Sequence, residues 1–138
     1  MLFFSSVLLC LVTSTLALPA PAPEAHLVAR AKIPASVTCE RTTFSVNEIK
    51  QTIANAKIPR QASNGKEYPD YFGNRSGSTT LFGNIPASSN LYGQPLTNPA
   101  WTGGPPGKYR VILNEKFNFV GVVVHTSHNL FKTCTITP

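Results

Sequence analysis

The chain has 138 residues, a net charge of +6 and only 13% charged residues. This length leaves room for one small domain and excludes a multidomain enzyme. The positive balance favours polyanionic partners such as nucleic acid or an anionic membrane surface, although simple solubility explains it equally well.

The N-terminal segment has the pattern of a targeting sequence. Residues 2–17 are uncharged, end in small residues and run directly into proline-rich sequence. They are too short to span a bilayer comfortably, so we expect a secretory signal peptide over residues 1–17. Alternating Pro and Ala in residues 18–31 favour an extended chain, which is either a propeptide or a disordered tail. Residues 32–138 form the predicted domain, which we expect to be secreted, extracellular and not membrane-bound.

The cysteines predict one disulfide. Cys10 is lost with the signal peptide, so the mature chain keeps Cys39 and Cys134. An even pair in a secreted chain indicates a disulfide. It closes a loop of about 95 residues, for which chain entropy predicts a stabilisation of roughly 4–5 kcal/mol. A metal site needs more Cys or His at ligand spacing, so we expect neither a metal nor a cofactor.

Residues 42–59 predict a single helix. Ser45 and Glu48 have the spacing of a capping box, and Phe44 and Ile49 have that of a hydrophobic staple. A proline ends the segment. Apolar residues at helical spacing predict the buried stripe, which consists of Val46, Ile49, Ile53 and Ala56.

After the helix, short apolar segments alternate with turns rich in Gly, Asn, Ser and Pro, including a loop over residues 101–108. The predicted strands are residues 67–72, 79–83, 90–96, 109–114, 119–126 and 129–136. One helix followed by antiparallel strands indicates an α+β domain. We therefore expect the N-terminal helix to pack on one face of a central antiparallel sheet.

The two central strands form a predicted hairpin with a loop of two or four residues. Either loop pairs Asn114 with Phe119 and places Arg110 opposite Val123, with His125 as its diagonal neighbour on the same face. Arg110 and His125 can then reach one phosphate-sized ligand; alternatively, they are a rim arginine and a solvated histidine. The residues that would face the helix are Val111, Leu113, Val120, Val122 and Val124.

Four segments carry a family resemblance. They are CERTTFSVNEIKQTIANA (39–56), EYP (67–69), WTGGPPGKYRVILNE (101–115) and GVVVHTSHNLFKTC (121–134). In this order they resemble the fungal guanyl-specific ribonucleases, which are small secreted endoribonucleases. The resemblance covers nearly all of the predicted domain, residues 37–134, and implies the microbial ribonuclease fold.

The resemblance also implies residue roles. In this family a carboxylate removes the 2′-hydroxyl proton of RNA, the 2′-oxygen attacks phosphorus, and a histidine protonates the departing 5′-oxygen. By this resemblance His125 is the general acid, while Arg110 and Tyr68 stabilise charge on the phosphate. Phe131 matches the aromatic residue beneath the phosphate, and Asn129 is a further substrate-binding candidate.

Two positions depart from the family pattern. Gly93 stands where the family has its base glutamate, and Asp70 stands where it has a histidine after the tyrosine–proline pair. Asp70 is either a substitute base or an ordinary surface or capping aspartate; Glu67 is a poorer candidate. The loop after Tyr71 does not match the guanine-binding loop of the family, so guanine preference is unsupported.

Three other residues have simpler interpretations. We expect His128 to be a loop histidine and Trp101 to be an aromatic residue that packs a loop. Asn74 begins an Asn-Arg-Ser pattern, which is a weak signal for N-glycosylation.

Three hypotheses follow for the function. The first is a monomeric, ribonuclease-like protein that binds single-stranded RNA with catalysis lost or weakened, similar to the secreted fungal effectors that enter host cells and bind host RNA or host proteins. The second is an active endoribonuclease that uses Asp70 as its base and His125 as its acid. The third is a protein-binding domain whose phosphate site is idle.

Overall fold

The computed structural model describes residues 33–138. The predicted signal peptide and the Pro/Ala-rich segment lie outside the described residues. Within them, α1 spans Val46–Ala56. The strands are β1 (Ser36–Cys39), β2 (Thr42–Ser45), β3 (Arg60–Gln61), β4 (Glu67–Tyr68), β5 (Asp70–Phe72), β6 (Arg75–Ser76), β7 (Thr79–Thr80), β8 (Leu91–Pro95), β9 (Tyr109–Asn114), β10 (Phe119–Ser127), β11 (Leu130–Thr133) and β12 (Thr135–Thr137).

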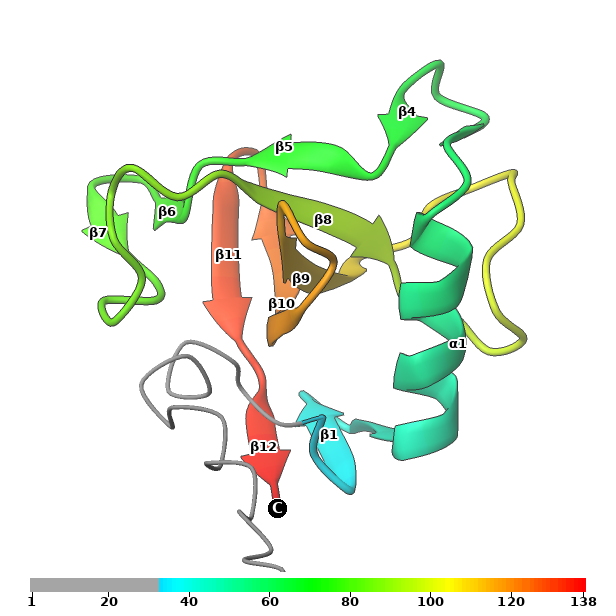
Figure 1. Ribbon diagram of the computed structural model, residues 1–138, viewed down its shortest axis with the longest axis horizontal. Coiled ribbons are helices and arrows are strands. Elements are labelled where there is room, and N and C mark those ends of the chain that lie inside the picture. Colours follow the sequence, from blue (N-terminus) through cyan, green and yellow to red (C-terminus); the bar gives the residue numbers. More distant parts are fainter. Residues whose placement is uncertain (1–32) are drawn as a thin grey trace, which may run out of the picture.

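The central feature is a five-stranded antiparallel sheet with the strand order β11-β10-β9-β8-β5. α1 lies along one side of this sheet, and the small β6–β7 hairpin lies at the opposite end (Figure 1). The combination of one helix with antiparallel strands agrees with the predicted α+β class. No helix within residues 33–138 is long and apolar enough to cross a membrane.

A second, three-stranded sheet joins the two ends of the domain in the order β12-β1-β2. No strand was predicted before the helix, so β1 and β2 are an addition. One continuous last strand was predicted, whereas the chain leaves the central sheet after β11 and enters the second sheet as β12 (Figure 1). The break falls at Cys134, which forms the predicted disulfide with Cys39 of β1 across a separation of 95 residues.

The helix begins as predicted. The Ser45 hydroxyl accepts a hydrogen bond from the Glu48 backbone N–H at 3.3 Å, and the Glu48 carboxylate accepts one from the Ser45 N–H at 3.4 Å. These reciprocal bonds satisfy two N–H groups that the first helical turn leaves unpaired. The fully buried residues of α1 are Ile49, Thr52 and Ala56. Val46 and Ile53, which the apolar stripe included, are half-buried.

Apolar side chains cover both faces of the central sheet. One cluster joins α1 to the sheet and contains Ile49, Ala56, Leu96, Val111, Leu113, Phe119 and Val122. It also includes Phe44, which places both residues of the predicted staple in one core. The cluster on the other face contains Phe72, Leu91, Ile112 and Val123. The sheet is therefore buried on two sides, which holds the side chains at its rim in defined positions.

The central hairpin differs from its predicted register at the loop. Arg110 lies opposite Val123, as expected, but Phe119 lies opposite Leu113 and not opposite Asn114. A bulge between Phe119 and Gly121 absorbs the difference. Because a shift of one residue moves a side chain to the other face, Phe119 joins the cluster beneath α1. Val120, which was predicted to face the helix, packs in the opposite cluster.

Candidate active site

The predicted phosphate site corresponds to a pocket of about 160 Å³. Its walls come from β4, β5, β8, β9, β10 and β11, which bring distant parts of the sequence together. Five of the predicted site residues line it: Tyr68, Asp70, Arg110, His125 and Phe131. Gly93 lines it too, whereas Glu67, the poorer candidate for a base, does not.

The Arg110 guanidinium is oriented by backbone carbonyls of the preceding loop and of the first residue of β9. Its Nη1 donates hydrogen bonds to the carbonyls of Pro106 at 3.1 Å, Gly107 at 2.8 Å and Tyr109 at 2.9 Å. Its Nη2 donates to the Tyr68 hydroxyl at 3.3 Å. One nitrogen is thus committed to holding the side chain in place, which leaves the Nη2 edge to face an anionic ligand.

Tyr68 is fixed from its other side. The tyrosine is 4% exposed and makes an edge-to-face contact with Trp101, with ring centroids 5.5 Å apart. The Trp101 indole N–H donates to the Gly104 carbonyl at 3.4 Å. Trp101 is therefore the loop-packing aromatic that the sequence analysis expected. Through Tyr68 it supports the phenol next to Arg110.

His125 stacks on Phe131. The two rings are 4.8 Å apart and inclined by 21°, and the residues are direct partners across β10 and β11. The His125 backbone N–H donates to the Lys108 carbonyl at 2.7 Å, and that of Phe131 donates to Ser76 Oγ at 2.9 Å. The imidazole therefore has a fixed plane at the pocket wall.

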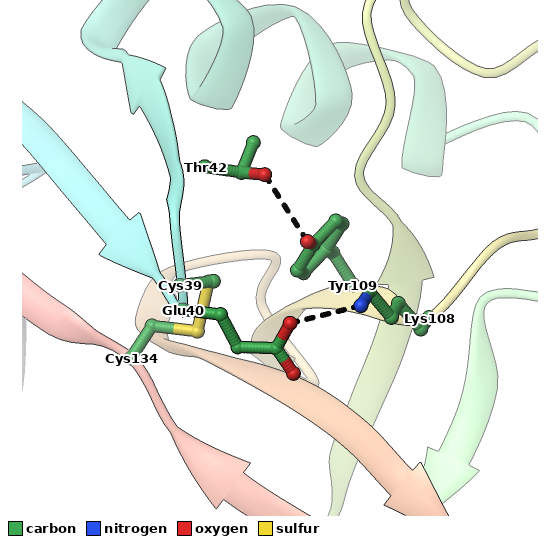
Figure 2. Close-up of polar contacts among 6 residues, drawn as sticks. All are labelled: Cys39, Glu40, Thr42, Lys108, Tyr109 and Cys134. Atoms are coloured by element: carbon green, nitrogen blue, oxygen red, sulfur yellow. Dashed lines mark hydrogen bonds and ion pairs between the residues drawn. A yellow bond between two sulfur atoms is a disulfide. The ribbon is translucent and has the colours of Figure 1, made fainter.

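An ion pair ties the start of β9 to the N-terminal hairpin (Figure 2). Lys108 Nζ lies 2.9 Å from Glu40, the residue that follows the disulfide-bonded Cys39. The hydrogen bond and charge of Glu40 raise the pKa of Lys108 above its ordinary value of 10.5. Beside it, the Tyr109 hydroxyl is hydrogen-bonded to Thr42 Oγ1 at 3.2 Å. These contacts hold Lys108, the last residue of the loop over residues 101–108, and Tyr109, the first residue of β9.

Asp70 and Gly93 are direct cross-strand partners in β5 and β8. A Cβ atom placed at Gly93 would lie 3.6 Å from Ile112 and 3.7 Å from Arg110, which are ordinary contact distances. The position therefore has room for a Cβ atom beside Arg110. The pocket contains a carboxylate after all, but it is on the neighbouring strand and comes from Asp70.

The pocket residues that were not identified from the sequence are Asn64, Lys66, Tyr71 and Phe72. Among them only Lys66 is charged, and its ammonium group lies 3.7 Å from the Asp70 carboxylate; the two side chains are 63% and 45% exposed. A lysine four residues before an aspartate was visible in the sequence. However, Lys66 lies in the turn before β4 and Asp70 begins β5, and only the tertiary structure shows that both line the pocket.

The other candidate residues lie outside this pocket. Asn129 lines an adjacent hollow that shares Asp70 and Phe131 with it. His128 is exposed, as expected for a loop histidine. The Asn74 amide donates to the Phe82 carbonyl at 3.0 Å and accepts from its N–H at 2.8 Å, so this side chain already has a structural role.

An antiparallel sheet with one capped helix, and a pocket that combines arginine, tyrosine and histidine, together define a ribonuclease-like α+β domain. A family model described as ribonuclease matches residues 32–135, and the chain belongs to that family. This match confirms the ribonuclease family that was predicted from the sequence. Comparison with curated proteins gives no match.

Proposed function

We propose that the mature chain is a secreted ribonuclease-like protein that binds the phosphodiester of single-stranded RNA and has weakened endonuclease activity. One observation carries this proposal: the pocket holds Arg110, Tyr68 and His125, while Gly93 occupies the position of the family's base. A glycine has no group that accepts a proton.

The proposed binding mode follows from the donors in the pocket. The guanidinium of Arg110 supplies a planar, permanently charged donor edge, and the Tyr68 hydroxyl lies beside it. His125 offers a further donor from the neighbouring strand β10. The net charge of +6 increases the local concentration of RNA. Such binding weakens as salt rises, because it releases counterions from the phosphates.

The proposed loss of activity follows from the first step of cleavage. The 2′-hydroxyl must lose its proton as it attacks phosphorus, and a positioned general base contributes roughly 10²–10⁴ to the rate. His125 can still protonate the leaving 5′-oxygen, and Arg110 can still stabilise charge in the transition state. We therefore expect cleavage to be slow and RNA binding to be retained.

The direct test is incubation of the mature, oxidised protein with single-stranded RNA, followed by analysis of the ends. Products with 2′,3′-cyclic phosphate that disappear in His125→Ala would demonstrate cleavage by this pocket. Binding that is salt-dependent and weakened in Arg110→Gln would demonstrate the phosphate site. Absence of any RNA binding at low salt would contradict the proposal and favour a protein-binding domain.

Restoring the base is the sharper experiment. Since a Cβ atom fits at Gly93 and the position lines the pocket, we expect Gly93→Glu to raise the cleavage rate by about 10²-fold or more. Gly93→Gln has the same shape without the carboxylate and is the matched control. The double variant Gly93→Glu, Asp70→His restores both family residues. If none of these variants cleaves RNA faster than the wild-type chain, Gly93 is not the cause of weak activity.

The position of Asp70 favours a second candidate function, an active endoribonuclease. Asp70 is the direct cross-strand partner of Gly93 and lines the same pocket, so its carboxylate can serve as the base. This candidate predicts substantial wild-type cleavage and its loss in Asp70→Asn. Under the first proposal Asp70→Asn leaves the slow cleavage unchanged. A role as a fungal effector delivered into host cells stays a prediction of the sequence analysis.

A further inference from the structure

The pocket contains a second cation for which the proposed function gives no role. Lys66 lines the pocket with Arg110, and its Nζ lies 3.7 Å from Asp70 Oδ2. Among the lining residues, all of which belong to the described part of the chain, Lys66 and Arg110 are the only lysine or arginine and Asp70 is the only carboxylate. The charge that a ligand meets therefore depends on where the Lys66 ammonium lies.

The backbone of Lys66 is fixed, whereas its side chain is free to move. Its N–H donates to Asn64 Oδ1 at 3.0 Å, and its carbonyl accepts from the Ala62 N–H at 2.7 Å. These bonds hold the turn before β4, so the side chain always starts beside the pocket. The side chain itself is 63% exposed. Its ammonium can therefore change partner without any change in the fold.

The contact between Lys66 and Asp70 is weak. A separation of 3.7 Å is too long for a hydrogen bond, and exposed pairs of this kind contribute little to stability. The Lys108–Glu40 pair, at 2.9 Å, is much closer. A phosphodiester entering the pocket brings a negative charge that attracts Lys66 and is repelled by Asp70. The exchange of one partner for the other is thus electrostatically favourable for the lysine.

We propose that Lys66 is a phosphate-binding residue, which leaves Asp70 and contacts the phosphodiester when RNA binds. Lys66 and Arg110 then hold the phosphate from two different elements, the turn before β4 and strand β9. The inference rests on the proposed function of the pocket. It also explains how the pocket accepts an aspartate where the related ribonucleases have a histidine: Lys66 supplies the positive charge that Asp70 lacks.

The test is the salt dependence of single-stranded RNA binding, measured by fluorescence anisotropy between about 50 and about 200 mM salt. Each phosphate contact made by a lysine contributes about 0.7 to the slope of log affinity against log salt. Lys66→Gln should remove one contact, so its loss of affinity over this range should be about 2.6-fold smaller than that of the wild-type chain. Lys66→Arg should keep the wild-type slope.

The matched control is Lys50→Gln. Lys50 is exposed on α1 and does not line the pocket, and its replacement removes the same formal charge. Its slope should stay close to that of the wild-type chain. Equal slopes for Lys66→Gln and Lys50→Gln would overturn the inference, because the lysine would then act only through net charge.

A second comparison separates a phosphate contact from neutralisation of Asp70. In Asp70→Asn the carboxylate is gone, so a lysine that merely neutralises it would have no further effect. A lysine that binds phosphate would still lower the slope when Lys66→Gln is added to Asp70→Asn. No change on this addition would overturn the inference.

Failure of the inference can be told apart from failure of the proposed function. If Arg110→Gln weakens RNA binding and Lys66→Gln does not, the pocket binds phosphate without Lys66. If neither variant changes RNA binding, the pocket is not the RNA site, and both the inference and the proposed function are wrong.

Discussion

At the scale of single residues, the absence of a side chain has opposite meanings at two glycines. At Gly93 an added Cβ meets only ordinary contacts, so the missing carboxylate is not required by packing. At Gly121 an added Cβ would lie 2.5 Å from the ring of Phe82. Gly121 is therefore a packing requirement: it lets the loop after β7 close over the bulged strand β10.

The packing role of Gly121 gives a stability prediction. Gly121→Ala forces the Phe82 ring to move and should lower the free energy of unfolding by about 1–3 kcal/mol, the usual cost of overpacking. Urea denaturation measures this change. Gly83→Ala is the control, since an added Cβ there meets nothing within 4 Å. Adding Phe82→Leu should recover part of the loss; equal stability of both alanine variants would contradict the prediction.

At the scale of elements, two local sets of contacts define where α1 and β9 begin. The capping box of Ser45 and Glu48 starts the helix, and the Glu40–Lys108 ion pair anchors the residue before β9. Lys108 also accepts the hydrogen bond from the His125 N–H. The strand that carries Arg110 and the strand that carries His125 are thus positioned by the same short segment.

Removal of the helix cap should lower the free energy of unfolding by a defined amount. Ser45→Ala removes the hydroxyl that accepts the Glu48 N–H and should cost about 1 kcal/mol of unfolding free energy. Ser45→Asp keeps an acceptor at the same place and should restore most of the stability. Urea denaturation of the wild-type chain and of the two variants measures these differences in unfolding free energy. An aspartate variant as unstable as the alanine variant would show that the cap hydrogen bond is not the cause.

The contribution of the Glu40–Lys108 ion pair to stability should change at alkaline pH. Since Glu40 raises the folded-state pKa of Lys108 above 10.5, the pair's stabilisation is fully present below the ordinary lysine value and is lost as pH rises through the folded-state pKa. The stability difference between the wild-type chain and Glu40→Gln should be constant from about pH 7 to about pH 9 and shrink above pH 10.5. Glu115→Gln, an exposed residue in neither ion pair of residues 33–138, should show no such change.

At the scale of the whole molecule, the disulfide joins the two ends of the domain. Cys39 and Cys134 are 95 residues apart, and the segments that they connect form a three-stranded sheet. This second sheet consists of three short strands that are partly exposed. The cross-link therefore limits the entropy of the unfolded chain more than any local contact does.

Removal of the disulfide should destabilise the entire domain. Cys39→Ser with Cys134→Ser should lower the unfolding free energy by roughly 2–5 kcal/mol, because the long loop regains its freedom in the unfolded state. Urea denaturation of the variant and of the reduced wild-type chain should give similar values. A loss smaller than that of Ser45→Ala would show that the native contacts of β1 and β12 hold the ends without the cross-link.

Local signals explain which parts of the fold were predicted. The capping box, the hairpin strand Tyr109–Asn114 and the cysteine pair each depend on residues close in sequence or on a simple count. The strands β1 and β2 were missed because they are short and flank a turn, and β12, which pairs with β1, is far away in sequence. The bulge between Phe119 and Gly121 was missed because no local sequence pattern marks it, and Phe82, the ring next to Gly121, comes from another loop.

The sequence by itself determined the chemical groups of this protein: Arg110 and His125 on the two central strands, the disulfide cysteines, and Gly93 where the resemblance implies a base glutamate. The pairing of Arg110 with Val123 followed from the short loop expected between the two strands, which is a local property, although a bulge shifts the pair nearest the loop. Only the tertiary structure decided that Asp70 faces Gly93 and that Lys66 shares their pocket. Those relations arise from contacts between distant segments, and the charges that a ligand would meet depend on them.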